Sequence, residues 1–226
     1  MKTAAVVVAA GSGVRLGADL PKALVLLADR PLVQWAVAAF SERPDIASIV
    51  VVAPAEHLER VRGLLDPSVT VVSGGAERQD SVSAGLAALD DDIDAVLVHD
   101  AARPLVPGHV VDDVVAALAD DRPAVIPVLA VADTIKRIRP DGTVAETVDR
   151  AELRAVQTPQ GFRRSVLEQA HQASQGGSTD DASLVEALGL PVHTVAGSEL
   201  SLKITTRHDL RVAEALLAAR RLESGR

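Results

Sequence analysis

A glycine-rich segment with two cations follows the first apolar run of the sequence. Its small and basic residues are Ala10, Gly11, Gly13, Arg15 and Lys22. Glycines let backbone amides approach an anion closely, and the two basic side chains add mobile positive charge beside it. Leu16 stands where a dinucleotide-binding G-x-G-x-x-G motif has its third glycine, and no Gly-Lys-Ser/Thr of a P-loop follows. The segment predicts phosphate binding outside both motifs, and a plain strand-to-helix turn is the alternative.

A second glycine segment, Gly74-Gly75, lies between another apolar run and a helix-like stretch. Open backbone groups at Gly75 and Ala76 suit the face of a flat base, and the Ser81 hydroxyl could bond to the polar edge of that base. Capping of the next helix by Asp80 or Ser81 explains the same residues without a ligand. Base binding and capping therefore remain as alternatives for this segment.

A third apolar run ends in Asp100, which Ala101 and Arg103 follow. A strand-end carboxylate facing a ligand crevice suits Mg²⁺ or another divalent cation, which binds through one or two carboxylates and nucleotide phosphates. A structural ion pair between Asp100 and Arg103 is the alternative. His99 is predicted to be a packing histidine, and no second acidic residue is spaced for an all-protein metal cage.

Polar residues recur in the last third of the chain. Residues 158–162 and 179–183 predict polar turns, and Thr179 is a good N-cap for a helix that runs to Ala187. Lys203 is predicted to lie in a late apolar strand, where a charged side chain is costly unless it reaches an anion or solvent. A purely structural role is therefore the first expectation for the turns at Thr158 and Thr179, and Lys203 is the further candidate site residue.

The elements that must position these residues alternate between short apolar runs and helix-like segments. Strands are predicted at 4–10, 46–53, 69–72, 95–99 and 124–128, and helices at 31–42, 56–65, 81–89 and 110–119. This alternation predicts βαβ units, and hence an α/β fold with a mostly parallel sheet and helices on both faces. Ligands bind beyond the carboxyl ends of the strands in such a fold.

Residues 131–161 break this alternation. Asp141-Gly142 is a tight-turn signal between two extended segments, which predicts a β-hairpin arm that projects from the main sheet. Because an isolated two-stranded hairpin is marginal in water, the arm is expected to pack on something else, most simply a second subunit. No domain linker or repeat is evident, so residues 1–226 are interpreted as one domain.

Composition narrows the classes of function. The 226 residues are 48% hydrophobic, which suffices for a substantial core. A formal net charge of −8 argues against nucleic acid as a partner. The absence of cysteine excludes a disulfide framework, a thiolate metal site and a cysteine nucleophile. No stretch has the roughly 20 apolar residues of a membrane span, and the first apolar run is a better strand than signal peptide, so no membrane partner and a cytoplasmic location are expected.

The order of motifs along nearly the whole chain resembles the cytidylyltransferases of the non-mevalonate isoprenoid pathway. The matching motifs are A-A-G-x-G-x-R-x-G…P-K at 9–22, G-G-x-x-R-x-D-S at 74–81, H-D-A-A-R-P at 99–104, D-T at 133–134, D-R at 149–150, T-P-Q at 158–160, T-D-D-A at 179–182 and K-I-T at 203–205. Many sugar-nucleotide pyrophosphorylases share the first motif, whereas the later motifs in this order are far more specific.

The resemblance implies a Rossmann-like three-layer fold of the nucleotide-diphospho-sugar transferase type. It also implies a Mg²⁺-assisted homodimeric enzyme that joins CTP to 2-C-methyl-D-erythritol 4-phosphate and releases pyrophosphate. The catalytic residues that it implies are Arg15, Lys22, Lys203 and Arg150, the last from the neighbouring subunit's arm. The nucleotide-binding residues that it implies are Ala10, Gly11, Gly13, Gly74, Gly75, Ala76, Ser81, Asp100, Ala101 and Lys203, with Asp100 also near the metal. The acceptor-binding residues that it implies are Arg103, Thr134, Arg150, Thr158 and Thr179.

Two departures and two rival functions accompany this resemblance. Ala76 replaces an acidic residue of some relatives, so a base contact there would involve only the backbone, and Leu20 stands where others have cysteine. A related enzyme that uses ribitol 5-phosphate or another sugar phosphate is one rival. A noncatalytic nucleotide-binding module is the other, and it would bind CTP without turnover.

Overall fold

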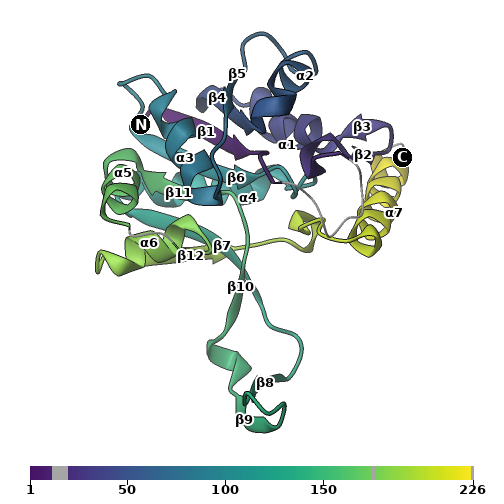
Figure 1. The fold of residues 1–226 in the computed structure, drawn as a ribbon, viewed down its shortest axis with the longest axis vertical. Helices are drawn as coiled ribbons and strands as arrows, with labels where there is room; N and C mark the ends of the chain where they lie inside the picture. The colour runs from purple at the N-terminus through teal and green to yellow at the C-terminus, as the bar shows by residue number, and fades with distance from the viewer. Residues whose placement is uncertain (12–19, 175–176, 225–226) are drawn as a thin grey trace.

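A mixed β-sheet forms the centre of this computed structural model, which describes residues 1–11, 20–174 and 177–224 (Figure 1). Within the described residues the sheet has eight strands, namely β1 (Thr3–Val8), β4 (Ile46–Ala53), β5 (Thr70–Ser73), β6 (Ala95–Asp100), β7 (Ala124–Ala130), β10 (Arg154–Val156), β11 (Gln160–Arg163) and β12 (Val192–Ala196). Their order is β10-β7-β11-β6-β1-β4-β5, and β12 pairs with β7. Only β10 and β11 among these described strands pair antiparallel with their neighbours, so the prediction of a mostly parallel sheet is confirmed.

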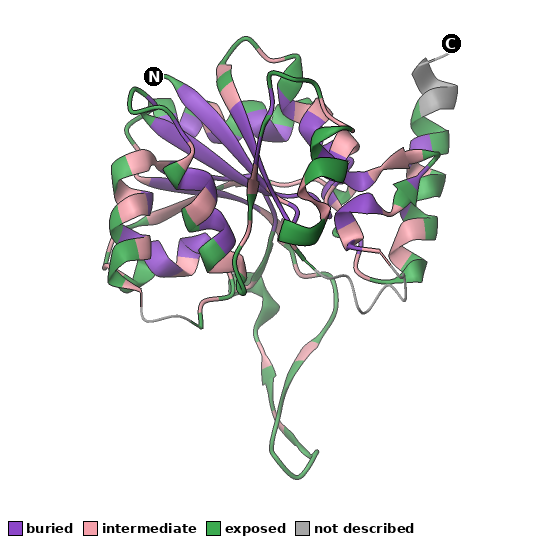
Figure 2. Ribbon diagram, turned by 45° about the horizontal axis from the view of Figure 1, so that its top comes forward, coloured by how far each residue is buried: buried purple, intermediate pink, exposed green. Residues whose placement is uncertain are grey.

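Helices cover both faces of the sheet. One face carries α1 (Leu32–Ser41), α2 (Leu58–Arg62) and α4 (Gly108–Ala119), and the other carries α3 (Arg78–Ala87), α5 (Arg164–Ala173) and α6 (Asp181–Ala187). Alternate residues of β1 enter the two cores, Ala5 and Val7 on the first face and Ala4 and Val6 on the second. Figure 2 shows these buried strands between two layers of half-exposed helices, which is the predicted three-layer arrangement.

A third apolar cluster holds the C-terminal helix α7 (Arg207–Ser224) beside the small hairpin of β2 (Leu26–Leu27) and β3 (Arg30–Pro31). Leu27, Ile204 and Leu217 are buried together in it. Ile204 anchors the segment that precedes α7 in this cluster. The cluster therefore holds the segment that carries Lys203 beside the hairpin of β2 and β3.

A close helix-to-sheet contact sets the position of α3. A Cβ atom on Gly85 would lie 2.4 Å from Val6 Cγ1 and 3.0 Å from Val52 Cγ2, so no larger residue fits without a shift of the core. Gly74 is equally tight, because a Cβ atom there would lie 2.7 Å from both Ala10 Cβ and Ser81 Oγ. These contacts bring the start of α3 against the loop that follows β1.

The arm projects from the body of the molecule as predicted (Figure 1). It consists of β8 (Ile135–Ile138) and β9 (Val144–Val148), which pair antiparallel around Gly142 at φ +83°. The predicted range 131–161 is too long, because β10 and part of β11 lie within it and belong to the main sheet. Two large apolar side chains of the arm face solvent in the single chain, Ile138 at 55% and Val144 at 52% exposure.

Two other local predictions are wrong. Residues 202–205 are not a strand, because they follow the 3-10 turn η5 (Glu199–Ser201) as an irregular segment, and the last strand is β12. The alternating pattern of these residues arises because Ile204 is buried and its backbone N–H donates to Ala102 O at 2.8 Å. Gln160 belongs to a buried strand rather than a polar turn, since its amide is paired with Asp180 Oδ2 and the Ala182 N–H. No helix of the described chain is long and apolar enough to cross a membrane.

Candidate active site

The carboxyl ends of β1 and β6 meet at the point where the strand order reverses. Val8 and Asp100 are register partners there, and the Ala101 N–H donates to Val8 O at 3.0 Å. Ligands of open α/β sheets bind at such a reversal. A cavity of about 450 Å³ opens at this point, between the loop after β1, the start of α3 and the segment that carries Lys203.

This first cavity collects most of the residues predicted to bind a nucleotide. Those that line it are Ala10, Gly11, Gly75, Ala76, Ser81, Asp100, Ala101 and Lys203, and the predicted catalytic residue Lys22 lines it as well. Gly74 is outside the lining but packs directly against Ala10 and Ser81. Gly13 and Arg15 lie outside the described residues. Residues from four distant parts of the sequence therefore share one cavity.

Of the two residues predicted to cap α3, Asp80 is confirmed and Ser81 is not. The helix begins at Arg78, three residues before the predicted start, with Glu77 as its N-cap. Asp80 completes a capping box by accepting a hydrogen bond from the Glu77 N–H at 3.0 Å. Ser81 is inside the first turn of the helix, where its hydroxyl donates to Glu77 O at 3.2 Å. Ser81 is thus buried at the cavity wall rather than used as the cap.

Two cations surround the carboxylate of Asp100, which is 8% exposed. Lys203 Nζ lies 2.6 Å from Oδ2, and Arg78 Nε lies 3.3 Å from Oδ1. Burial by itself would raise the pKa of Asp100, but Arg78 and Lys203 hold the pKa well below its usual range. Asp100 is therefore ionised at neutral pH, and it fixes two positive groups at the cavity wall.

A second cavity of about 450 Å³ adjoins the first. Arg78, Asp100 and Lys203 line both cavities and so form their common wall. The predicted acceptor-binding residues Arg103, Thr158 and Thr179 line the second cavity. Ligands in the two cavities would therefore lie on either side of a carboxylate and two cations.

Arg103 does not form the ion pair with Asp100 that was one of its alternatives. Its Nη1 donates to Ser201 O at 2.7 Å and its Nη2 to Val156 O at 3.2 Å. The buried Nε has no hydrogen-bond partner among the described residues. The side chain thus ties η5 to β10, and it forms part of the lining of the second cavity.

A hydrogen-bonded chain supports Asp100 from below. The Asp100 N–H donates to Thr158 Oγ1 at 3.1 Å. His99 Nε2 lies 3.2 Å from Arg103 O, and because a carbonyl oxygen can only accept, Nε2 carries the proton of the neutral ring. His99 Nδ1 therefore accepts from the Thr158 hydroxyl at 3.0 Å. Burial lowers the pKa of His99 to about 4, so the ring is neutral at pH 7. The predicted packing role of His99 is confirmed.

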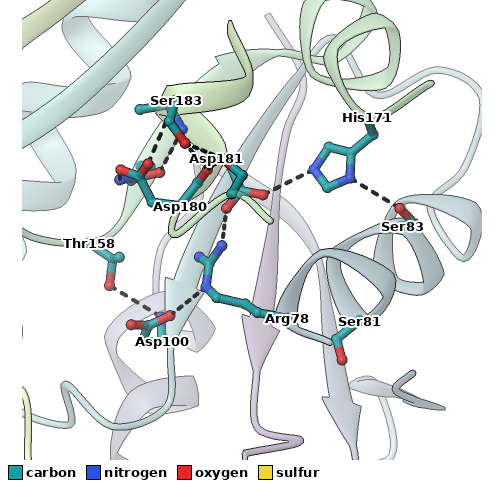
Figure 3. A network of polar contacts seen from close by, with 12 residues as sticks. Arg78, Ser81, Ser83, Asp100, Thr158, His171, Asp180, Asp181 and Ser183 are labelled. Atoms are coloured by element: carbon teal, nitrogen blue, oxygen red, sulfur yellow. Dashed lines mark hydrogen bonds and ion pairs between the residues drawn. The ribbon is translucent and has the colours of Figure 1, made fainter. Parts of the chain in front are cut away.

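A polar network behind the common wall escaped the sequence analysis (Figure 3). Arg78 Nη1 lies 2.6 Å from Asp181 Oδ2, and His171 Nε2 lies 3.0 Å from Asp181 Oδ1. Burial would lower the pKa of Arg78, but Asp181 and Asp100 raise it above its ordinary value. The N-cap of α6 is Asp180 rather than the predicted Thr179, because Asp180 Oδ1 accepts from the Ser183 N–H at 3.1 Å. Arg78 was visible in the G-G-x-x-R motif, but its partners are distant in sequence.

Thr134 and Arg150 line neither cavity of their own chain. Arg150 is exposed in the 3-10 turn η4 (Arg150–Glu152) of the arm, and its Nη1 donates to Ala132 O. Thr134 is an exposed residue directly before β8. The structure therefore places both residues outside the two cavities of their own chain.

Among the described residues that line the first cavity, Asp100 is the one that fits a divalent cation. No group of three or more His, Asp or Glu side chains is placed to hold a metal in the described part of the chain. Asp100 is ionised at the wall of a cavity with free space, and Mg²⁺ needs only one or two carboxylates when ligand phosphates complete its shell. Asp100 is therefore the residue that fits the predicted metal role.

An α/β fold with two adjoining cavities at the reversal of strand order defines the class of nucleotidyltransferases. Residues 3–219 match the family model of 2-C-methyl-D-erythritol 4-phosphate cytidylyltransferase. The chain is 52% identical over 217 residues to the enzyme of that name from Frankia casuarinae, covering 96% of this chain and 82% of the relative. It is 52% identical over 218 residues to the one from Nocardia farcinica, covering 96% and 94%.

Solved structures show the same relationship. The 2-C-methyl-D-erythritol 4-phosphate cytidylyltransferase of Thermus thermophilus superposes with a TM-score of 0.78 at 37% identity, covering 96% of this chain and 98% of that one. The 4-diphosphocytidyl-2C-methyl-D-erythritol synthase of Anaerococcus prevotii gives a TM-score of 0.84 at 28% identity with the same coverage. The chain belongs to the 2-C-methyl-D-erythritol 4-phosphate cytidylyltransferase family.

The low pKa of His99 predicts a pH-dependent stability. The ring has a pKa of about 4 when folded, and about 6.5 when unfolded. The unfolded state therefore binds more protons between these values, and the free energy of unfolding is expected to fall by about 2 kcal/mol from pH 7 to pH 5. Urea unfolding at the two pH values measures the change.

The variant His99→Gln should lose this slope, whatever its stability at pH 7. The exposed His109 of α4 provides the control, because His109→Gln is expected to keep the wild-type slope. A His99→Gln protein with the full wild-type slope would show that another group is responsible.

Proposed function

We propose that this protein transfers the cytidylyl group of CTP to 2-C-methyl-D-erythritol 4-phosphate, giving 4-diphosphocytidyl-2-C-methyl-D-erythritol and pyrophosphate. The observation that carries the proposal is the common wall of Arg78, Asp100 and Lys203 between two adjoining cavities, in a chain of this family. A transferase needs its two substrates side by side with cations at the point of contact. We further propose that the enzyme acts in the cytoplasm on these small molecules, without nucleic acid or a membrane as partner.

The first cavity suits CTP. The backbone at Gly75 and Ala76 and the buried Ser81 hydroxyl border one part of it and suit the base. The loop at Ala10 and Gly11 borders the phosphate end, with Lys22 beside it. The family resemblance places Arg15 next to these phosphates as well.

The reaction requires no strong base. An anionic oxygen of the acceptor phosphate attacks the α-phosphorus of CTP, the new P–O bond forms, and the bond to the β-phosphate breaks to release pyrophosphate. The enzyme must hold two mutually repelling anions in line and stabilise the charge on the transferred and leaving groups. Lys22 and Arg15 are proposed to do this on the nucleotide side, and Lys203 between the two phosphates.

The second cavity suits the acceptor. Arg103, Thr158 and Thr179 border this space with a guanidinium and two polar side chains. The resemblance implies that Arg150 of a neighbouring subunit binds the acceptor phosphate, and that Thr134 also contacts it. We propose a homodimer for this reason, since neither residue reaches a cavity of its own chain.

Mg²⁺ or another divalent cation is the proposed cofactor, and Asp100 would hold it together with the substrate phosphates. Bound there, the ion would neutralise phosphate charge and orient the triphosphate. Asp100 supplies the ionised carboxylate for this role, and Lys203 and Arg78 keep that carboxylate in place.

The proposed reaction is tested by pyrophosphate release with CTP, UTP and ATP, each against methylerythritol phosphate and ribitol 5-phosphate in the presence of Mg²⁺. Release is expected with CTP and methylerythritol phosphate at the highest kcat/KM. A preference for ribitol 5-phosphate would show the related sugar-phosphate enzyme. Binding of CTP without release would show the noncatalytic module.

The cations of the nucleotide site predict a selective loss of rate. Lys22→Ala and Arg15→Ala are each expected to lower kcat by about 10²–10³, because each removes a fixed positive charge beside the phosphates as negative charge develops there. Thermal unfolding should show that both variants still fold. Lys2→Ala is the matched control, since Lys2 pairs with Asp92 at the surface and lines neither cavity. An unchanged kcat in the Lys22 or Arg15 variant would count against the assignment.

The proposed dimer predicts that the exposed apolar side chains of the arm are needed for assembly. The double variant Ile138→Glu, Val144→Glu is expected to be monomeric in size-exclusion chromatography with light scattering, because burial of two carboxylates at an interface is unfavourable. Its activity should fall as well, since Arg150 would no longer reach a neighbouring site. Leu26→Glu alters a residue of similar exposure outside the arm and should remain dimeric. A monomeric wild type would contradict the proposal directly.

A further inference from the structure

Arg78 occupies the junction of the two cavities, and its guanidinium meets a different carboxylate on each side. Nη1 lies 2.6 Å from Asp181 Oδ2, whereas Nε lies 3.3 Å from Asp100 Oδ1. The side chain is 25% exposed, and it lines both cavities. The shorter contact shows that Asp181 is the principal anchor, and the remaining surface of the guanidinium is available to ligands.

Asp181 is built to hold that position. Its side chain is 1% exposed, and among the described residues each carboxylate oxygen has one partner, Arg78 on one side and His171 at 3.0 Å on the other. A buried carboxylate is costly unless its charge and hydrogen bonds are matched. Burial and the contact with His171 therefore fix the position of the Asp181 carboxylate, and the carboxylate in turn holds Arg78.

His171 completes a closed ring of contacts through three helices (Figure 3). Its side chain is 5% exposed, and its Nδ1 lies 3.1 Å from Ser83 Oγ. Ser83 and Arg78 both belong to α3, His171 to α5 and Asp181 to α6. The ring therefore begins and ends on the helix that carries the guanidinium, which fixes the guanidinium relative to its own backbone.

We propose that Asp181 is a positioning residue for nucleotidyl transfer, which holds Arg78 at the junction of the two cavities while His171 orients Asp181 from behind. The inference rests on the proposed function. A guanidinium held in this way does not follow the phosphate of the bound substrate, and it stays where charge develops during transfer. Such preorganised charge favours the transition state over the bound substrates.

The isosteric variant Asp181→Asn separates this role from a structural one. Without the carboxylate, Arg78 can move toward the ground-state phosphate, so kcat is expected to fall at least tenfold while the KM for CTP stays the same or falls. Arg78→Gln removes the cation itself and is expected to lower kcat and weaken CTP binding. Calorimetric titration with CTP gives the binding-competent fraction of each variant, and kcat is expressed per competent site.

Non-additivity provides the second criterion. If Asp181 acts through Arg78, the double variant Asp181→Asn, Arg78→Gln should have a kcat within threefold of Arg78→Gln alone. Val185→Ala is the control for lost stability, because Val185 is a fully buried residue of the same helix and lies outside both cavities. It should keep a kcat within threefold of the wild type at a temperature where all variants are folded.

Variants of His171 test whether this residue orients Asp181. His171→Gln retains a donor for Asp181 and should keep more of the wild-type kcat than His171→Leu, which retains none. Equal losses in these two variants, full additivity in the double variant, or a kcat of Asp181→Asn within threefold of the wild type would each overturn the inference.

The wild-type protein separates failure of the inference from failure of the proposed function. A wild type that releases no pyrophosphate contradicts the proposed function. In that case CTP binding is the only measurement that tests whether Asp181 positions Arg78. Weaker CTP binding in Arg78→Gln but not in Asp181→Asn supports the positioning role, whereas equal weakening in both variants contradicts it.

Discussion

The ion pairs of one nearly buried carboxylate hold the candidate site together. Asp100 ends β6 at the reversal of strand order, where an unpaired charge would be unstable. Arg78 from the start of α3 and Lys203 from the segment before α7 supply the two opposite charges. Because these cations come from distant parts of the chain, the pairing of Asp100 defines where the two cavities meet and which charges face a ligand.

The apolar framework makes that pairing geometrically possible. Gly85 allows α3 to lie directly on Val6 and Val52, and Gly74 lets the next loop contact Ala10. Below Asp100, the chain of hydrogen bonds through Thr158 to a neutral His99 fixes the end of β6 without adding charge. The cations at the wall therefore rest on a closely packed support, which is the condition for electrostatic stabilisation that needs little reorganisation.

The two-cavity arrangement explains why this fold suits transfer between two phosphates. The loop at Ala10 and Gly11 borders one cavity, and Arg103 and Thr158 border the other. In the proposed reaction, the acceptor oxygen and the α-phosphorus would meet at the wall that the two cavities share. The proposed dimer would complete the acceptor side, since the arm carries Arg150 away from the cavities of its own chain. Catalysis on this scaffold would then depend on the relative position of charges rather than on a reactive side chain.

The sequence determined the alternation of strands and helices, the hairpin arm and most of the residues that line the first cavity, because apolar periodicity and glycine spacing are local signals. It placed Asp100 at a strand end correctly, and it singled out Lys203 while assigning it to the wrong element. Only the tertiary structure decided the ion-pair partners of Asp100, the backbone contacts of Arg103, and the ring that joins Arg78 to Asp181 and His171. These pairings join residues up to 103 positions apart, and no local pattern encodes which charges meet once helices pack on a sheet.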